Sequence, residues 1–216
     1  MAWHGWRTTL RRWYPQLDED AKREAVVAVE LEGITVLELS SDGLTLAVCT
    51  TDEVLLYDTR ALVVDQETVA CSSKTIQQGS QIVQLKWGPA GSRHSHHFLV
   101  AHLEGGLYSG QVSEGSAQLG EVQLLSAEVR GSVDWSPDGT HVVCSEEGCI
   151  KVFSMQRADS QKYVTEVELF EGTVVDSVYW TRAGQLMATV QTSVSIAGTD
   201  GGGFRVQRLL VAGVDE

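Results

Sequence analysis

The sequence predicts an all-β fold made of repeated four-stranded antiparallel units. Short β-rich runs alternate with turn signals along most of the chain, which is typical of an all-β design rather than a βαβ design. One pattern of strands and turns occurs four times in the 216 residues. Glycine is frequent (21 residues) and proline is rare (3 residues), a balance that suits many tight turns.

The clearest of the four copies begins near residue 132. Its first strand, over 132–136, runs into the turn Ser136-Pro137-Asp138-Gly139. Proline presets φ in this turn, and glycine accepts a positive φ. Three further strands are expected over 141–145, 149–154 and 163–170.

The other three copies show the same order of elements. The first copy predicts strands over 34–39, 44–49 and 54–58, a looser strand over 61–69, and a preceding strand over 24–31. The second copy predicts strands over 82–87, 97–102, 106–108 and 118–125. The fourth copy predicts strands over 175–180, 186–190, 193–197 and 204–211.

The copies share a fixed register. Intervals of 48, 48 and 45 positions separate the apolar residues that end each first strand: Leu39, Trp87, Trp135 and Trp180. The same intervals separate the turn glycines Gly43, Gly91, Gly139 and Gly184. A period of about 40–50 residues with four strands per copy indicates the blades of a β-propeller. A β-sandwich would explain the strands but not the regular interval.

Blades of a propeller pack face to face, because one sheet cannot bury both of its faces alone. We therefore expect the four residues that end the first strands to anchor the space between neighbouring blades. The blades are predicted at about 33–80, 81–128, 129–173 and 174–212, within a domain over 25–212. Four copies are fewer than the seven of a common propeller, so we expect an incomplete seven-bladed ring, or one whose other blades have diverged or been lost.

The first 24 residues differ from the repeats, and 213–216 form a short tail. Aromatic residues (Trp3, Trp6, Trp13 and Tyr14) lie there among arginines. One interpretation is an anchor for a partner or a membrane surface. The other is a loosely ordered extension, or the edge of an incompletely represented domain, which we favour because termini are usually poorly ordered unless tied down.

Composition limits the partners. The net charge of −13 would repel phosphates, which argues against a nucleic-acid backbone as the main partner and leaves a basic protein surface. No apolar run reaches the roughly 18 residues of a membrane span, and the N-terminus lacks the apolar core of a secretory signal. Four cysteines in a chain of this size do not make a disulfide scaffold, so a reducing, intracellular environment is expected.

No catalytic residue or cofactor site is predicted. Asp42 and Asp138 are equivalent turn residues, whose task is to accept hydrogen bonds from backbone amides. Asp134 is the other carboxylate that a search for catalytic pairs would select. The sequence lacks a Gly-x-Ser-x-Gly elbow, a Walker loop and a dinucleotide fingerprint. A propeller enzyme, such as a hydrolase or quinoprotein, would need convergent polar residues at its channel mouth.

No metal site or reactive thiol is predicted either. A histidine-rich group invites a metal interpretation: His94, His96, His97 and His102, with Glu104. Most of this group lies in a loop, whereas a built site needs fixed ligand geometry and a second shell. Cys49 and Cys144 hold nearly the same place in their copies, which indicates buried apolar filler rather than redox chemistry, although Cys149 lies across a turn from Cys144.

Acidic residues in two of the copies have two interpretations, of which we favour a solvated face. Asp52, Glu53, Glu146 and Glu147 fall in two turns between the second and third strands of their copies. One interpretation is a surface that steers a basic partner. The alternative is a solvated face that keeps a β-rich protein soluble.

The copies resemble WD40-type repeats. Trp135-Ser136-Pro137-Asp138-Gly139 is similar to the common ending of that family's first strand, and Tyr57-Asp58 stands where the family has Trp-Asp. The other copies lack this dipeptide, and no Gly-His pair precedes any copy. The chain is therefore similar to a divergent propeller without the hydrogen-bonded network of strict WD40 blades.

Among divergent propellers, the chain resembles the N-terminal propeller of the cytoplasmic-face FG nucleoporins. The resemblance is carried by 39–48 (LSSDGLTLAV), 132–139 (SVDWSPDG) and 147–153 (EGCIKVF). It implies a non-catalytic scaffold at the nuclear pore complex that docks a DEAD-box RNA helicase, or binds other nucleoporins, in mRNA export. Phe-Gly repeats, which a full-length member carries, are absent from these 216 residues. The alternative is a generic WD40-like adaptor of another complex in the cytoplasm or nucleus.

Overall fold

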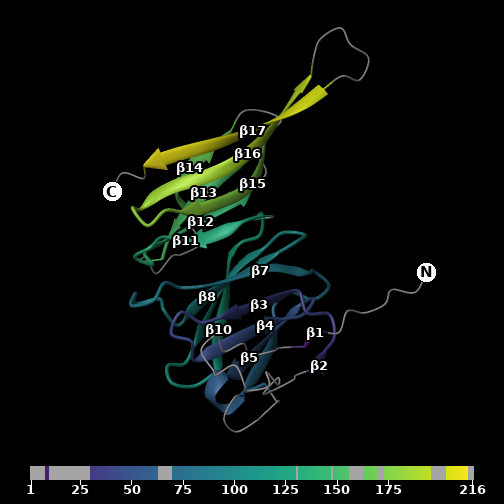
Figure 1. Cartoon of the computed structure of the whole chain (residues 1–216), viewed down its shortest axis with the longest axis vertical. Coiled ribbons are helices and arrows are strands. Elements are labelled where there is room, and N and C mark those ends of the chain that lie inside the picture. The colour runs from purple at the N-terminus through teal and green to yellow at the C-terminus, as the bar shows by residue number, and fades with distance from the viewer. Residues whose placement is uncertain are drawn as a thin grey trace, which may run out of the picture.

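The computed structural model is all-β. It describes residues 8–9, 30–62, 70–129, 131–146, 148–155, 163–169, 173–195 and 203–213. The strands in these residues form one two-stranded sheet and four larger antiparallel sheets. The four larger sheets follow one another in chain order along the long axis of the molecule, and they do not close into a ring (Figure 1). This arrangement confirms the predicted all-β repeat.

Blade 1 contains four consecutive strands: β3 (Val36–Leu39), β4 (Thr45–Cys49), β5 (Glu53–Asp58) and β6 (Ser72–Thr75). The predicted fourth strand over 61–69 is wrong where the structure describes it, because residues 59–62 are helical. Asp58 explains this difference. Its Oδ1 accepts hydrogen bonds from the backbone amides of Arg60 (2.7 Å) and Ala61 (3.0 Å), which is the pattern of a helix N-cap. The fourth strand begins only at Ser72.

Blades 2 and 3 have the predicted order of four strands. Blade 2 contains β7 (Ile82–Trp87), β8 (His97–His102), β9 (Leu107–Val112) and β10 (Leu119–Ser126). Blade 3 contains β11 (Val133–Trp135), β12 (His141–Glu146), β13 (Cys149–Ser154) and β14 (Tyr163–Glu168). In both blades each strand pairs with the next strand of the chain, which gives the simplest antiparallel meander.

Blade 4 differs from its prediction. Its described strands are β15 (Thr173–Trp180), β16 (Gln185–Ser195) and β17 (Gly203–Gly213). The two strands predicted over 186–190 and 193–197 are one strand as far as Ser195, because Gln191-Thr192 supplies neither glycine nor proline to make a turn. β16 and β17 pair from Gln185↔Gly213 to Ser195↔Gly203, and this long hairpin extends beyond the stacked sheets (Figure 1).

The N-terminal part contributes a small sheet. β1 (Thr8–Thr9) pairs antiparallel with β2 (Glu30–Leu31), so the predicted strand over 24–31 is seen only at its end. The remainder of 1–24, including the tryptophans, lies outside the described residues, as does the tail after Gly213. The domain boundaries drawn from the sequence therefore stay a prediction.

One turn joins the first and second strands in equivalent blades. In blade 1, Ser40 Oγ donates to Asp42 Oδ1 (2.6 Å), and in blade 3 Ser136 Oγ donates to Asp138 Oδ1 at the same distance. All four turn glycines have positive φ, at 75°, 76°, 73° and 76° for Gly43, Gly91, Gly139 and Gly184. Only glycine adopts this conformation without strain. At Gly139 a Cβ atom would also lie 2.6 Å from Ser92 Oγ of blade 2.

The core lies between successive blades. One cluster of buried apolar residues joins blades 1 and 2, a second joins blades 2 and 3, and a third joins blades 3 and 4. Side chains of a strand alternate between its two faces. In β4, Ala47 belongs to the cluster shared with blade 2, whereas Leu46 and Val48 belong to a separate cluster with Tyr57. Both faces of β4 are therefore buried.

Candidate functional site

Two tryptophans of the predicted register join blade 2 to blade 1 and blade 3 to blade 2. Trp87 ends β7 with 9% of its surface exposed, and its Nε1 donates to the carbonyl oxygen of Glu38 in blade 1 (3.3 Å). Trp135 ends β11 with 5% exposed, and its Nε1 donates to the carbonyl oxygen of Lys86 in blade 2 (3.2 Å). Both bonds span 49 positions of sequence. The repeat interval is thus the interval of a physical contact between blades.

Other polar side chains also join neighbouring blades. The amide of Gln84 in β7 donates to the carbonyl oxygen of Val133 (3.1 Å) and accepts from its backbone nitrogen (3.0 Å), as a neighbouring strand would. Ser132 Oγ donates to the carbonyl oxygen of Val178 between blades 3 and 4 (3.2 Å). These side chains satisfy backbone groups that face the next blade, which buried backbone groups require.

The junction of blades 3 and 4 uses a different bond. The backbone nitrogen of Trp180 donates to Asp134 Oδ2 (2.9 Å), while the buried Nε1 of Trp180 has no hydrogen-bond partner among the residues that the structure describes. Burial raises the pKa of Asp134, although backbone hydrogen bonds from Trp180 and Trp135 and the charge of Lys86 oppose that shift. The carboxylate that a search for catalytic residues would select is therefore a link between blades.

Leu39 does not behave as the fourth anchor. Its side chain is 52% exposed, so the expectation that it fills a space between blades needs correction. Each tryptophan contacts the preceding blade, and β3 belongs to the first of the four described blades. No described blade lies on the side where Leu39 would insert.

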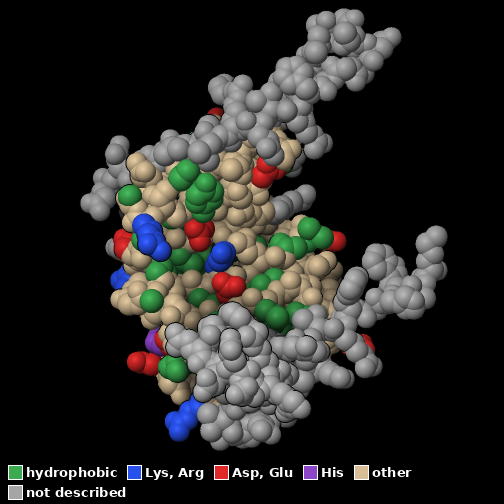
Figure 2. Space-filling view, viewed as in Figure 1, with side chains coloured by type: hydrophobic (Ala, Val, Ile, Leu, Met, Phe, Trp, Pro, Cys, Tyr) green, Lys and Arg blue, Asp and Glu red, His purple; other side chains and the backbone are tan. Residues whose placement is uncertain are grey.

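The predicted acidic surface is not assembled as expected. Glu146 is only 8% exposed and forms an ion pair with Lys151 Nζ, and its Oε1 accepts from Ser126 Oγ (3.0 Å). Glu146 is therefore an internal residue of the junction between blades 2 and 3, not a surface charge. Asp52 and Glu53 are half-buried, and Glu147 lies outside the described residues. Figure 2 shows acidic and basic side chains interspersed on the visible face rather than one acidic area.

Three of the predicted histidines, His94, His97 and His102, are packing residues. The ring of His94 stacks on Trp135 with centroids 5.8 Å apart and meets the ring of His97 edge to face at 4.8 Å. Burial, with the nearby charges of His97 and Arg93, lowers the pKa of His94 to about 4. His102 is buried, with its Nδ1 3.0 Å from the carbonyl oxygen of Ser80. Within the described segments, no three His, Cys, Asp or Glu side chains meet as a metal site would need.

The cysteines carry free thiols. Cys49 and Cys144 are completely buried in the clusters between blades, and burial raises the pKa of Cys49 to about 12 and that of Cys144 further. Burial, with a hydrogen bond to Glu166, raises the pKa of Cys149 to about 11. Since the thiolate is the reactive form, these cysteines are unreactive in the folded protein.

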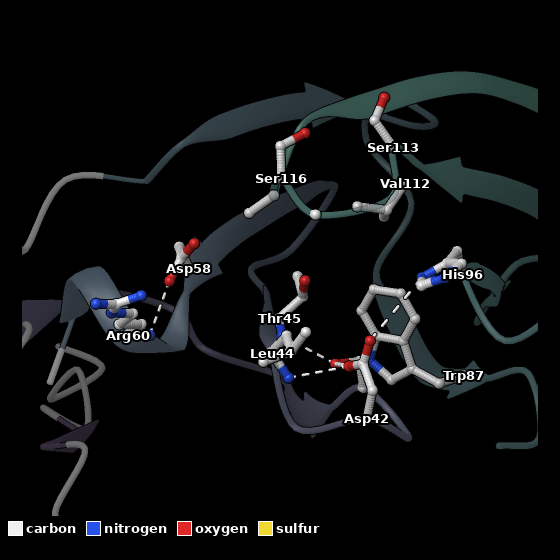
Figure 3. A pocket seen from close by; sticks show the side chains of 13 residues that line it. Asp42, Leu44, Thr45, Asp58, Arg60, Trp87, His96, Val112, Ser113 and Ser116 are labelled. Carbon is white, nitrogen blue, oxygen red and sulfur yellow. Dashed lines mark hydrogen bonds and ion pairs between the residues drawn. The ribbon is translucent and has the colours of Figure 1, made fainter.

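An acidic pocket lies between blades 1 and 2. Its volume is about 190 Å³. Blade 1 contributes Asp42, Leu44 and Thr45 beside the first turn and Asp58 at the end of β5; blade 2 contributes Trp87 and His96 and the β9–β10 turn around Gly115 (Figure 3). Sequence reasoning identified Asp42 and Trp87 as architecture only. Their spacing does not reveal that the β9–β10 turn of the next blade closes a pocket over them.

The carboxylate of Asp42 is held in place at the pocket. It accepts hydrogen bonds at Oδ1 from Ser40 Oγ (2.6 Å) and the backbone nitrogen of Leu44 (2.9 Å), and its Oδ2 lies 4.0 Å from His96 Nδ1. Burial acts against ionisation, but these hydrogen bonds and His96 lower the pKa of Asp42 overall. The pocket therefore keeps a negative charge at neutral pH.

Comparison with known proteins places the fold. No family model matches the sequence. Among the described helical residues, none forms a helix of the length and hydropathy that crossing a membrane requires. The β-propeller domain of Cps50 (Swd1) from Myceliophteria thermophila is similar in structure, with a TM-score of 0.54 and 14% sequence identity. The match covers 79% of this chain and 56% of that domain, so this chain spans little more than half of its length. At this identity the likeness concerns the fold, and the chain has the fold of a β-propeller whose described blades leave the ring open.

Proposed function

We propose that this chain is a non-catalytic scaffold for protein interactions. The observation that carries the proposal is that the conspicuous polar residues of the described blades stabilise the fold. Asp134 and, through Ser126, Glu146 link blades, and Asp138 closes a turn. His94 packs on a tryptophan between blades 2 and 3. What remains to distinguish this propeller from others is its surface, and surfaces bind partners.

The specific role we propose is a nucleoporin-like dock for a DEAD-box RNA helicase in mRNA export, on the cytoplasmic face of the nuclear pore complex. Its support is the resemblance of 39–48, 132–139 and 147–153 to that family of propellers. The net charge of −13 adds support, because it attracts basic proteins and repels free nucleic acid. Other nucleoporins are the second kind of partner that this role implies.

A generic WD40-like adaptor is the second candidate, in a complex of the cytoplasm or nucleus. The propeller fold supports this role equally well, since the two candidates differ only in the partner. Phe-Gly repeats in the same reading frame would favour the nucleoporin role.

Titration calorimetry with a purified DEAD-box helicase tests the specific role. We expect binding that weakens as salt is added, because opposite charges across an interface are screened. The control is the same titration with a helicase whose basic surface residues are replaced by glutamine. No heat of binding by protein with a native circular dichroism spectrum would remove the helicase role and leave the adaptor.

A further inference from the structure

The acidic pocket between blades 1 and 2 has an unused hydrogen-bonding group at its base. Thr45 is 8% exposed, and what remains exposed of it lines this pocket. Its backbone nitrogen is bonded to Ser40 Oγ (2.9 Å), but its hydroxyl has no partner among the described residues. Figure 3 shows the hydroxyl directed into the space below the β9–β10 turn. This hydroxyl is therefore open to the pocket and available to hydrogen-bond a ligand that enters it.

Two carboxylates border the same space. Asp42 Oδ1 is used within its turn, and Oδ2 faces His96 from 4.0 Å, too far for a hydrogen bond. Asp58 uses Oδ1 for two backbone amides, and no described residue bonds to its Oδ2. Each carboxylate therefore offers one oxygen to a donor that enters the pocket.

The apolar part of the pocket favours the same class of ligand. Trp87 contributes its ring to the lining, and the face of an indole attracts a cation. Arg60 is the one lining residue with a permanent positive charge. Its side chain is exposed, and it contacts Asp58 through its backbone nitrogen. The lining thus offers three hydrogen-bond acceptors and one aromatic ring but only one permanent positive charge, which favours a cationic ligand.

The volume limits the ligand to a single side chain. At about 190 Å³, the cavity is smaller than the roughly 300–1,000 Å³ that drug-sized ligands and cofactors fill. A guanidinium or ammonium group carries several donors on a slender stem and matches carboxylate and hydroxyl oxygens.

We propose that this pocket binds one arginine or lysine side chain of a partner protein. The proposal rests on the scaffold role and adds a site and a chemical class to it. The ammonium or guanidinium donates to Asp42, Asp58 and Thr45, while the stem of the side chain lies along Trp87.

The first test uses small probes on the whole chain. Butylguanidinium and butylammonium are titrated into ¹⁵N-labelled protein, followed by the resonances of the Leu44 amide and the Trp87 indole. We expect saturable shifts with both cations and none with neutral butyramide. A capped peptide with one central arginine should bind at the same resonances, and its glutamine counterpart should not. Binding of the free cations but not of the peptide would overturn the assignment to a protein partner.

Matched variants give the test its specificity. Asp42→Asn and Asp138→Asn remove the same turn carboxylate from blades 1 and 3, since Asp138 bonds Ser136 and Thr140 as Asp42 bonds Ser40 and Leu44. Only Asp42→Asn should weaken probe binding, by about fivefold or more, as expected for loss of a charged hydrogen-bond acceptor. Equal weakening in both variants would overturn the proposal.

Two further substitutions separate the alternatives without touching the turn. Thr45→Val should weaken binding, and Arg60→Gln should leave it unchanged or strengthen it. Shifts with phosphate that disappear in Arg60→Gln would show an anion site and overturn the proposal. Absence of any saturable shift would do the same, yet helicase binding in the calorimetric test would then still stand, so the two proposals fail independently.

Discussion

The substitution Trp135→Ala tests the junction between blades 2 and 3. Trp135 is buried among apolar residues of both blades, and its Nε1 bonds the carbonyl oxygen of Lys86. Replacing a buried tryptophan by alanine costs about 3–5 kcal/mol, mainly through lost transfer free energy and the cavity left behind. The lost hydrogen bond contributes about 1 kcal/mol of this and leaves a carbonyl oxygen unpaired.

Two companion variants separate the contribution of the hydrogen bond from that of the buried ring and test the position in the register. Trp135→Phe keeps an aromatic ring on His94 but removes the donor, so we expect a loss of about 1–2 kcal/mol. Leu39→Ala removes a residue of the same register whose side chain is exposed, and it should cost less than about 0.5 kcal/mol.

Urea unfolding followed by far-ultraviolet circular dichroism measures all three changes. A total stability of about 5–15 kcal/mol means that Trp135→Ala alone could leave the protein partly unfolded, so Trp135→Phe is the more quantitative variant. The reasoning is refuted if Leu39→Ala lowers the unfolding midpoint as much as Trp135→Ala does.

Three other outcomes follow from burial and charge. Because burial lowers the pKa of His94 to about 4, the folded state binds fewer protons than the unfolded state, and stability should fall as the pH drops from about 6.5 to about 4. His94→Gln should flatten that fall in urea midpoints measured against pH, and an unchanged slope would contradict it. Glu146→Ala should lower the free energy of unfolding by about 3 kcal/mol, since it leaves the ammonium of Lys151 without its nearest carboxylate. The double variant Glu146→Leu with Lys151→Met should lose much less stability, because it leaves no unpaired charge. Thermal melts that rank the double variant below the single one would contradict this. A thiol reagent should modify half-buried Cys71 in the native protein but reach Cys49 only on unfolding, and fast native modification of Cys49 would show that it is accessible.

The sequence predicted the repeat well because equivalent contacts between successive blades recur at a fixed interval along the chain. Trp87 and Trp135 lie 48 positions apart, and each donates to a carbonyl oxygen that lies 49 positions before it in the preceding blade. The repeat period therefore matches the sequence separation of this contact to within one position. The turn positions could be predicted equally well, because the positive φ at Gly43 and Gly139 favours the glycine that the sequence has there. Strand order then follows from short connections.

What could not be predicted depends on neighbours in space. Glu146 and Glu147 look alike as turn residues, but pairing of β12 with β13 brings Glu146 to Lys151, and Ser126 of blade 2 donates to its other oxygen, where it is buried. Leu39 shares the register of the tryptophans and lacks their surroundings. In blade 4, pairing with β17 along its whole length holds β16 straight where the other blades turn.

The pocket illustrates the same limit. Asp42, Asp58 and Trp87 each have a structural explanation that the sequence supplies: a turn, a helix cap and an anchor. Their common cavity exists only because the β9–β10 turn of blade 2 reaches over blade 1. No spacing along the chain reports a contact between a turn and the blade before it.

The tryptophan bonds between blades have a direction. Trp87 finds its acceptor at Glu38 and Trp135 finds its acceptor at Lys86, so each donor follows its acceptor in the chain. Proteins are synthesised from the N-terminus, and repeat units gain stability from their immediate neighbours. Each new tryptophan therefore leaves the ribosome after the sheet that receives it, and the blades can be added in the order in which they are made.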